Sequence, residues 1–354
     1  MPDQKQQQLW AAQDLIAAFP LPTLIIGDEH VIVALNELAE DVLGNAVLGR
    51  HFATAVRHPK LVAAVEQGLT NRTPQTVTYQ IVENGEDVNY KGHLQVIGDT
   101  DLLLFSLENV SGAERAEQMR RDFIANVSHE LRTPLTSVMG FIETLRGPAR
   151  NDAKAQDRFL AIMADEAERM NRLVGDLLSL SRVQAEERVR PNTQIDLRAL
   201  LQTTLKNLNP MAAKNNVTLQ MELGTGPLSF VGDADQLIQI FTNLIENAIK
   251  YGGADQTVDV TIEHVMHDPV LRGPAIEIKI ADQGPGIAPL HLPRLTERFY
   301  RADGHRNRQL GGTGLGLAIV KHILNRHRGR LKISSQVGQG SQFTVVLPSI
   351  VNDG

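Results

Sequence analysis

Residues Phe123 to Leu135 read FIANVSHELRTPL, and the prediction of the fold starts from this stretch. Apolar residues recur here and just beyond at steps of three and four, which is typical of one face of an α-helix: Ile124, Val127, Leu131, Leu135, Val138, Ile142 and Leu145. At about 100° per residue, His129 lies roughly 140° around the helix from Ile124. The sequence therefore predicts that His129 faces solvent or a docking partner.

The chemistry of His129 depends on its neighbours. Glu130 can hydrogen-bond the ring, and a neutral imidazole nitrogen oriented by a carboxylate is a good nucleophile. Pro134 has no N–H for the carbonyl of Glu130 and clashes with it, so we expect a kink and a less rigid turn. For a lone His-Glu pair, a solvated helix with an incidental histidine would be the favoured interpretation.

The composition limits the class of protein. A chain of 354 residues should hold two or three domains, and its net charge of −6 gives no sign of a nucleic-acid-binding surface. The absence of cysteine excludes disulfides and thiolate chemistry. No apolar run approaches the roughly 18 residues of a membrane span, and the N-terminus is too polar for a signal peptide. We expect a cytoplasmic protein, or the soluble part of an inner-membrane sensor, with membrane association only through a segment absent from this chain.

Two helices are predicted around the opening stretch. One runs from Val110 to Gly147 and the next from about Asp152 to Glu187, with an apolar stripe of Phe159, Met163, Met170, Leu173, Leu177 and Leu180. A hairpin of two helices with one apolar face is not stable alone in water. We therefore predict that residues 110–188 form a homodimer as a four-helix bundle.

The flanking regions mix strands and helices. Residues 1–14 are a polar tail, and residues 15–109 show two strands, short helices and then three strands, with an Asn84-Gly85 hairpin. One of the short helices is predicted from Leu61 to Leu69, ending at Gly68 or nearby. Residues 189–350 contain helices at Leu197–Asn207, Ala234–Tyr251 and Leu315–His327 among six strand-like runs. Helices on one face of a mixed sheet make an α/β sandwich. The predicted fold class is multidomain α+β.

Four patches in residues 189–350 suggest nucleotide chemistry. Asn243, Asn247 and Lys250 share one helix face at i, i+4 and i+7, although asparagine is a poor residue for a helix interior. They suit Mg²⁺ and a phosphate, but a solvated polar face explains them equally well. Asp282 ends an apolar strand, and Gly284 and Gly286 beside it permit close approach of the backbone.

The other two patches are RFYR at 298–301 and GGTGLGL at 311–317. A glycine-rich loop before a helix cradles phosphates with its N–H groups. Rossmann and P-loop sites are disfavoured, because no strand of a βαβ unit leads directly into the loop and the Walker lysine is absent.

These strings resemble a known family. Ser128 to Leu135, SHELRTPL, resembles the phosphoacceptor box of sensor histidine kinases. The four patches resemble the N, G1, F and G2 boxes of the histidine-kinase ATP domain, in the wider gyrase/Hsp90/MutL class, and the likeness covers residues 112–350. Residues 15–109 resemble a PAS sensor domain. One departure is Thr296, where the F box often has Phe, which leaves the packing of the lid open.

The resemblance implies ATP as substrate and Mg²⁺ as cofactor. Asn243 and Asn247 would hold Mg²⁺, Lys250 would meet phosphate, Tyr251 would lie by the base or ribose, and Asp282 would read adenine N6. The other residues of the boxes would complete the site: Gly284, Gly286, Ile287, Gly312, Thr313, Gly314, Leu315, Gly316 and Leu317.

The implied function is that of a protein-histidine kinase. His129 would accept the γ-phosphoryl group, Glu130 would orient or deprotonate its ring, and Arg298 or Arg301 would neutralise developing charge. The phosphoryl group would pass to an aspartate of a response regulator, and Thr133 would position water for regulator dephosphorylation. Residues Arg57 to Leu61 resemble a segment of phosphate-regulon sensor kinases, which suggests phosphate sensing.

Three alternatives remain at this point. A mechanical ATPase of the gyrase/Hsp90 type would share the ATP site without the His129 box. A non-catalytic signalling scaffold would have a broken motif. A serine kinase of the anti-sigma type would not need the two bundle helices.

Overall fold

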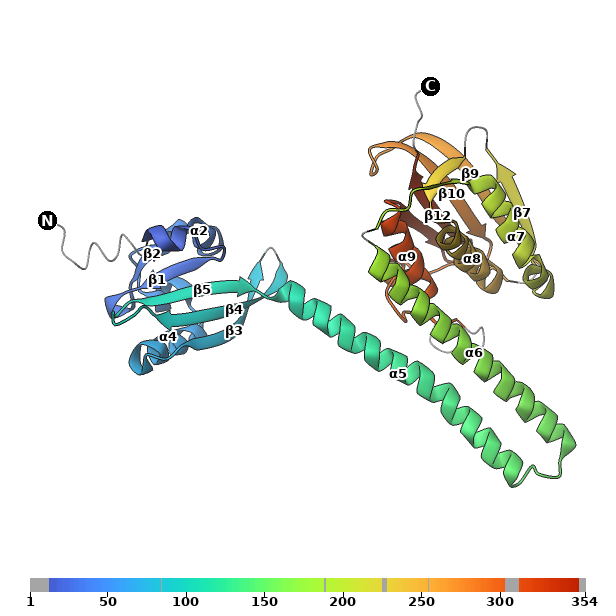
Figure 1. The fold of residues 1–354 in the computed structure, drawn as a ribbon, viewed down its shortest axis with the longest axis horizontal. Coiled ribbons are helices and arrows are strands. Elements are labelled where there is room, and N and C mark those ends of the chain that lie inside the picture. Colours follow the sequence, from blue (N-terminus) through green and yellow to red (C-terminus); the bar gives the residue numbers. More distant parts are fainter. Residues whose placement is uncertain are drawn as a thin grey trace. The chain divides into compact units, whose positions relative to one another are not determined.

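The computed structural model describes residues 13–83, 85–187, 189–224, 228–253, 255–302 and 312–349. The chain divides into two compact units, one ending at Ile124 and the other beginning at Ala125. Both mix helices and strands (Figure 1), as the predicted fold class requires.

The first unit contains a five-stranded antiparallel sheet in the order β2-β1-β5-β4-β3. The strands are β1 (Thr23–Ile26), β2 (Ile32–Leu35), β3 (Gln75–Glu83), β4 (Glu86–Val96) and β5 (Leu103–Asn109). Glu83 pairs with Glu86, so a two-residue turn joins β3 to β4 as predicted, although Asn84 itself lies outside the described residues. This sheet is consistent with a PAS-like fold.

Short helices cover this sheet: α2 (Glu37–Leu43), α3 (Phe52–Val56) and α4 (Pro59–Asn71). Phe52 and Leu61 bring α3 and α4 into a core with Leu24 and Phe105 of the sheet. The prediction that α4 ends near Gly68 is wrong, because Gly68 is buried and a Cβ there would touch Leu103. This glycine allows close helix–sheet packing and does not cap the helix.

Two long helices follow, α5 (Ser111–Arg146) and α6 (Ala153–Glu186), as predicted (Figure 1). Asp152 caps α6 by accepting a hydrogen bond from the N–H of Ala155. Phe141 and Phe159 stack 5.2 Å apart between the two helices. The hairpin of amphipathic helices is therefore present, with the His129 turn inside α5.

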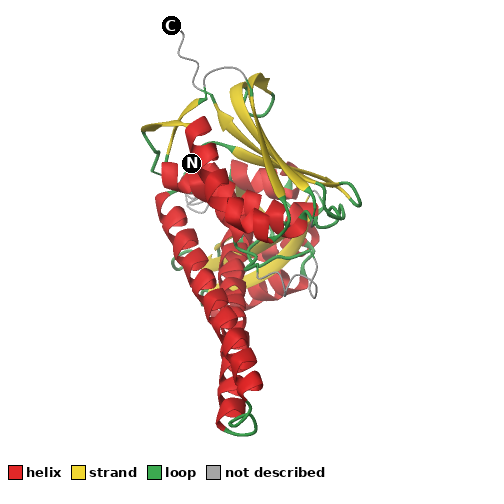
Figure 2. Cartoon of the chain, turned by 90° about the vertical axis from the view of Figure 1, so that its right-hand side faces the viewer, coloured by secondary structure: helices red, strands yellow, loops and turns green. Residues whose placement is uncertain are grey.

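The second unit holds a five-stranded sheet in the order β11-β12-β10-β9-β7. The strands are β7 (Thr218–Leu223), β9 (Thr257–Asp268), β10 (Gly273–Asp282), β11 (Arg330–Gln336) and β12 (Gly340–Pro348). Only the β7–β9 pair is parallel among these described strands. Helices α7 (Leu197–Lys214), α8 (Ala234–Tyr251) and α9 (Gly316–Arg326) lie against one face of this sheet. Figure 2 shows the strands of the sheet in yellow on one side and the helices in red on the other.

Two predictions in this unit need correction. Helix α7 continues to Lys214 and not only to Asn207, because its buried face continues through Leu208 and Ala212. One strand was not predicted: β6 (Thr193–Asp196), which pairs with β8 (Ser229–Gly232) in a separate two-stranded sheet. Strand β6 is four residues long and buries only Ile195, too few positions to show an alternating pattern.

The C-terminal half of α6 packs along α9, and Ser179 of α6 also contacts Gln239 of α8. Ser179 and the side-chain amide of Gln239 exchange hydrogen bonds of 2.7 and 2.8 Å. Further along α6, Gln184 and Glu187 lie 3.2 and 3.3 Å from the ring nitrogens of His322. These contacts hold α6 against the helical layer of the sheet, beside the site described next.

Candidate functional site

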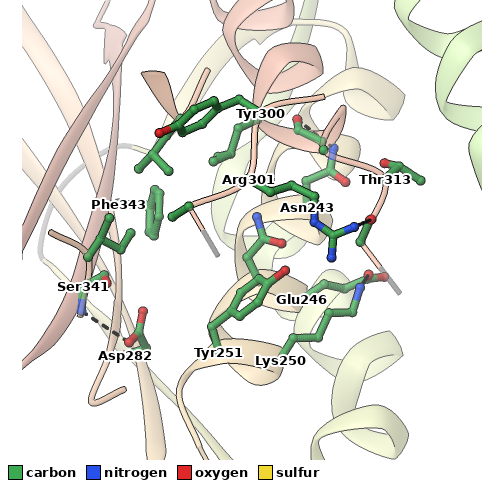
Figure 3. A pocket seen from close by; sticks show the side chains of 18 of the residues that line it. Asn243, Glu246, Lys250, Tyr251, Asp282, Tyr300, Arg301, Thr313, Ser341 and Phe343 are labelled. Carbon is green, nitrogen blue, oxygen red and sulfur yellow. Dashed lines mark hydrogen bonds and ion pairs between the residues drawn. The ribbon is translucent and has the colours of Figure 1, made fainter. Parts of the chain in front are cut away.

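A cavity of about 970 Å³ opens between α8, the loop after β10, the loop before α9 and the C-terminal half of α6. Figure 3 shows side chains of α8, of Asp282 at the end of β10 and of Thr313 in the loop before α9 around it. Most of the predicted nucleotide residues line this one cavity: Asn243, Asn247, Lys250, Tyr251, Asp282, Gly286, Ile287, Arg301, Gly312, Thr313, Gly314, Gly316 and Leu317.

Three predicted positions among the described residues do not line the cavity. Leu315 is fully buried in the core, and Arg298 does not line the cavity. Gly284 does not line it either, but its N–H donates to the carboxylate of Asp282. Gly311 lies outside the described residues. Of the two candidate arginines, Arg301 therefore has the place beside the cavity, and its guanidinium donates to the carbonyl of Gly312 at 2.9 Å.

Asp282 lies at the end of β10 and is 8% exposed. Its Oδ1 accepts from the N–H of Gly284 at 2.9 Å and of Ser341 at 3.3 Å. Burial raises the pKa of Asp282, and these two hydrogen bonds only partly offset it. A Cβ on Gly284 would overlap the carbonyl oxygen of Tyr251, so only glycine fits beside this carboxylate.

Two glycines have backbone conformations that other residues rarely adopt. Gly286 has φ of 72° and Gly314 has φ of 73°. A Cβ on Gly286 would overlap the carbonyl of Gln336, and one on Gly314 would lie 2.9 Å from the Cα of Phe299. Glycine therefore shapes both loops that border the cavity.

The polar face of α8 forms the floor of the cavity. Leu244, Ile245 and Ala248 are buried in the core, while Asn243 and Asn247 face the cavity. The ammonium group of Lys250 lies 2.7 Å from Glu246 Oε2. The polar face of α8 therefore borders a cavity, which favours the nucleotide-site interpretation over a helix face that only contacts solvent.

Helix α6 contributes lining residues that the sequence did not indicate. Arg172, Gly175 and Asp176 of α6 line the cavity, and the hydroxyl of Thr313 donates to Asp176 Oδ2 at 2.6 Å. Burial raises the pKa of Asp176, against the hydrogen bond from Thr313 that lowers it. No local signal marks these residues, because they reach the site only through the packing of α6.

His291 and Tyr300 form another contact at the cavity that the sequence did not indicate. His291 Nδ1 lies 2.7 Å from the hydroxyl of Tyr300, and the guanidinium carbon of Arg294 lies 4.2 Å from the centre of the Tyr300 ring. Phe343 lines the same cavity (Figure 3). The spacing of His291 and Tyr300 in the sequence gave no sign of this contact.

His129 is exposed on α5, as its helical position predicted. In this structure Glu130 forms an ion pair with Arg169 of α6, at 2.8 Å. The hydroxyl of Thr133 donates to the carbonyl of His129 at 3.1 Å. Thr313 borders both the cavity and a small recess that Glu130 and Pro134 line, so the glycine-rich loop lies next to the turn that follows His129.

Comparisons with known proteins agree with this geometry. Residues 232–350 match the family described as histidine kinase-, DNA gyrase B- and HSP90-like ATPase, and residues 119–186 match the His Kinase A (phospho-acceptor) domain. The phosphate regulon sensor protein PhoR of Pseudomonas aeruginosa is 34% identical over 338 residues, which cover 94% of this chain and 73% of that protein. The chain belongs to the sensor histidine kinase family.

Other relatives support the same assignment. The sensor protein kinase WalK of Staphylococcus aureus is 37% identical over 268 residues, which cover 75% of this kinase and 63% of that protein. The solved structure of histidine kinase ThkA in complex with response regulator protein TrrA has a TM-score of 0.52 and 18% identity. It covers 96% of this kinase and 99% of that chain, and it supports the fold.

The family assignment decides the class of activity. The chain is a protein-histidine kinase of two-component signalling, and its ATPase-type domain uses ATP. The match to the phospho-acceptor domain excludes a mechanical ATPase that lacks the His129 box. Among the described residues, no helix combines the length and the apolar character that a membrane crossing needs.

Proposed function

We propose that this kinase transfers the γ-phosphoryl group of Mg-ATP to His129 and then to an aspartate of a response regulator. The observation that carries this proposal is the position of Thr313, which borders both the nucleotide cavity and the recess at Glu130. The glycine-rich loop and the phosphoacceptor turn therefore lie close enough for one small movement to join them.

The cavity suits a purine nucleotide along its whole length. Asp282 accepts the exocyclic amine of adenine, and Tyr251 lies beside the base or ribose. Asn243 and Asn247 offer amide oxygens, which Mg²⁺ takes together with phosphate oxygens. Bound Mg²⁺ would neutralise charge on the phosphates, while Lys250 and Arg301 supply cationic donors from the two sides of the cavity.

The phosphoacceptor step uses groups of this chain. A ring nitrogen of His129 bonds to the γ-phosphorus as the bond to the bridging oxygen breaks, and ADP carries away the electron pair. Glu130 accepts or orients the ring proton, and its ion pair with Arg169 holds the carboxylate beside the histidine turn. Such transfers depend on positioning and electrostatics more than on covalent chemistry by the protein.

The experiment that tests the acceptor is His129→Ala. The variant should bind nucleotide with the wild-type dissociation constant, because His129 does not line the cavity, yet it should acquire no label from γ-labelled ATP. His93→Ala is the matched control, since the side chain of His93 is 40% exposed and contacts only the side chain of Glu108 among the interactions described. Acid-labile label on the His129→Ala chain would place the acceptor elsewhere.

The functional unit that we propose is a homodimer with a four-helix bundle. Helices α5 and α6 leave large apolar side chains exposed: Met119, Ile124, Leu135, Met139, Ile142, Leu160, Val174 and Leu178. A second copy of the same hairpin would cover them. We propose residues 15–109, 110–188 and 189–350 as the sensor, dimerisation and catalytic domains.

A second activity, dephosphorylation of the regulator, is proposed for Thr133. Its hydroxyl proton is used by the His129 carbonyl, which leaves oxygen lone pairs to hold a water near the regulator's phosphoaspartate. Thr133→Ala should keep most autokinase activity and lose on the order of 10²-fold in phosphatase rate, since one positioning contact is removed. The readout is the lifetime of the phosphorylated regulator with ADP present.

Thr144→Ala is a matched control for this prediction. The hydroxyl of Thr144 donates in the same way to the carbonyl four residues earlier on α5, that of Gly140, at 2.8 Å, but Thr144 lies eleven residues beyond Thr133. It should leave both rates unchanged. A wild-type phosphatase rate in Thr133→Ala would show that Thr133 is only a helix-surface residue.

The proposed pathway is phosphate sensing. It is supported by the similarity to PhoR over 94% of this chain and by the segment Arg57 to Leu61, in which His58 and Pro59 begin α4. The cognate regulator would be identified by comparing phosphotransfer rates from the labelled kinase to each candidate regulator of the same organism.

A further inference from the structure

We propose that Asp176 of α6 determines nucleotide specificity, so that the kinase with α6 docked as in this structure binds ADP in preference to ATP. This inference rests on the proposed nucleotide site. It concerns a residue of the bundle helix that none of the four nucleotide boxes contains.

The first observation is where Asp176 lies. It borders the cavity together with Arg172 and Gly175, and its partner Thr313 lies on the side of the cavity away from Asp282 (Figure 3). Adenine at Asp282 directs the phosphate chain toward Lys250 and Thr313. Asp176 therefore stands where the last phosphate of the chain would end.

The second observation is the charge around Asp176. Glu246 also lines the cavity and interacts unfavourably with Asp176, while Lys250 and Arg172 interact favourably with it. Lys250 is already paired with Glu246 at 2.7 Å. A γ-phosphate would add negative charge next to these two carboxylates, whereas the shorter diphosphate would end before them.

The third observation concerns the hydroxyl of Thr313. A threonine hydroxyl has one proton to donate, and here Asp176 takes it at 2.6 Å. In the glycine-rich loop this hydroxyl would otherwise be available to a phosphate oxygen. Asp176 thus disfavours the triphosphate twice, by its charge and by occupying this donor.

The position of Asp176 is held by its own helix. One turn further along α6, Ser179 is bonded to Gln239 of α8, and Gln184 contacts His322 of α9. The carboxylate cannot withdraw while these contacts persist. ATP therefore binds well only when α6 shifts away from α8 and α9, which makes Asp176 a sensor of the position of α6.

The test measures dissociation constants of Mg-ADP and of a non-hydrolysable β,γ-imido analogue of Mg-ATP by calorimetry on the full chain. Asp176→Asn keeps the shape and can still accept from Thr313, but it removes the charge. We expect the analogue to bind about tenfold more tightly to this variant, the order of an interaction between close charges that are partly screened. Affinity for ADP should change less than about threefold by the same reasoning.

Two further variants complete the design. Asp176→Glu retains the charge and should restore a preference for ADP. Asp165→Asn removes the same charge from an exposed position of α6 eleven residues earlier and should leave both constants unchanged. Wild-type ADP affinity in each variant shows that the cavity is intact.

The outcomes separate the two proposals. An unchanged ratio of ADP to analogue affinity in Asp176→Asn overturns the role of Asp176. Weaker binding of the analogue to that variant also overturns it, because Asp176 would then support the triphosphate. If the wild-type chain binds neither nucleotide, it is the proposed nucleotide site itself that fails.

Discussion

At the scale of single residues, the buried carboxylate of Asp282 has opposite effects on folding and on binding. Burial raises its pKa, so the folded chain holds a proton on this group more tightly than the unfolded chain does. Its contribution to stability is therefore greatest at low pH and is lost as the pH rises through the folded-state pKa. At neutral pH the charged carboxylate destabilises the fold.

Asp282→Asn should therefore raise the melting temperature at neutral pH while it weakens nucleotide binding. The amide oxygen can still accept from Gly284 and Ser341, but the variant presents a donor to the adenine amine, and we expect affinity to fall by about tenfold or more. Calorimetry measures both quantities. Glu222→Gln, an exposed change on β7, should alter neither. A melting temperature of Asp282→Asn below that of the wild type at neutral pH would contradict the inference that the buried, charged carboxylate destabilises the fold.

At the scale of elements, the C-terminal end of α9 depends on a neutral histidine. His327 is 4% exposed, its Nε2 accepts from the N–H of Asp233 at 3.0 Å, and Nδ1 lies 2.8 Å from the carbonyl of Ile323. Burial lowers its pKa, and the neighbouring cations Arg326 and Arg190 add to this, against Asp233 and the Ile323 bond. Protonation would remove the Nε2 acceptor, so the end of α9 favours the neutral ring.

Stability should therefore fall as the medium is acidified. Because the unfolded chain binds the proton more readily, the free energy of unfolding decreases as the pH falls below about 6.5, by up to roughly 1.4 kcal/mol per pH unit at 25 °C. The decrease ends at the lower pKa of the folded state. Thermal melting between pH 7.5 and 5.5 measures the effect.

His327→Gln is the comparison for this dependence. Its side chain can accept from Asp233 and donate to Ile323 without titrating, so its melting temperature should vary less with pH in this range. His93→Gln, which replaces a partly exposed histidine of the first unit, should keep the wild-type slope. Parallel curves for His327→Gln and wild type would assign the pH dependence to other groups.

At the scale of the whole molecule, the exposed apolar faces of α5 and α6 predict assembly. Leu135, Met139 and Ile142 are 51%, 56% and 41% exposed on consecutive turns of α5. Full burial of such a side chain contributes about 1.5–3 kcal/mol. Two copies of the chain would bury this stripe twice.

The full chain should sediment as a dimer, and Met139→Glu with Ile142→Glu should raise its dissociation constant by about a hundredfold or more, as four charges would enter the interface. Val270→Glu is the control, because Val270 is similarly exposed, at 64%, on the second unit away from these helices. A wild-type chain that sediments as a monomer at micromolar concentration would refute the dimer.

Much of the fold followed from local patterns. The heptad-like spacing of apolar residues located α5 and α6 almost to the residue, and Ala234–Tyr251 was predicted with its observed bounds, because long amphipathic helices carry a strong periodic signal. Strand β6 was missed, since a four-residue strand with one buried side chain carries almost none. Gly68 was misread as a helix end, because its role depends on a strand that lies 35 residues further along the chain.

For the site, the sequence by itself determined which chemical groups are present. The order of the asparagines, Asp282 and the glycines predicted a shared cavity, and they line one because the polar face of α8, the loop after β10 and the loop before α9 border the same opening. The tertiary structure alone decided which arginine borders that cavity and brought Asp176 to Thr313, 137 positions apart in the chain. Contacts of this kind come from the packing of α6 on α8 and α9, and packing between distant segments leaves no periodic mark in either one.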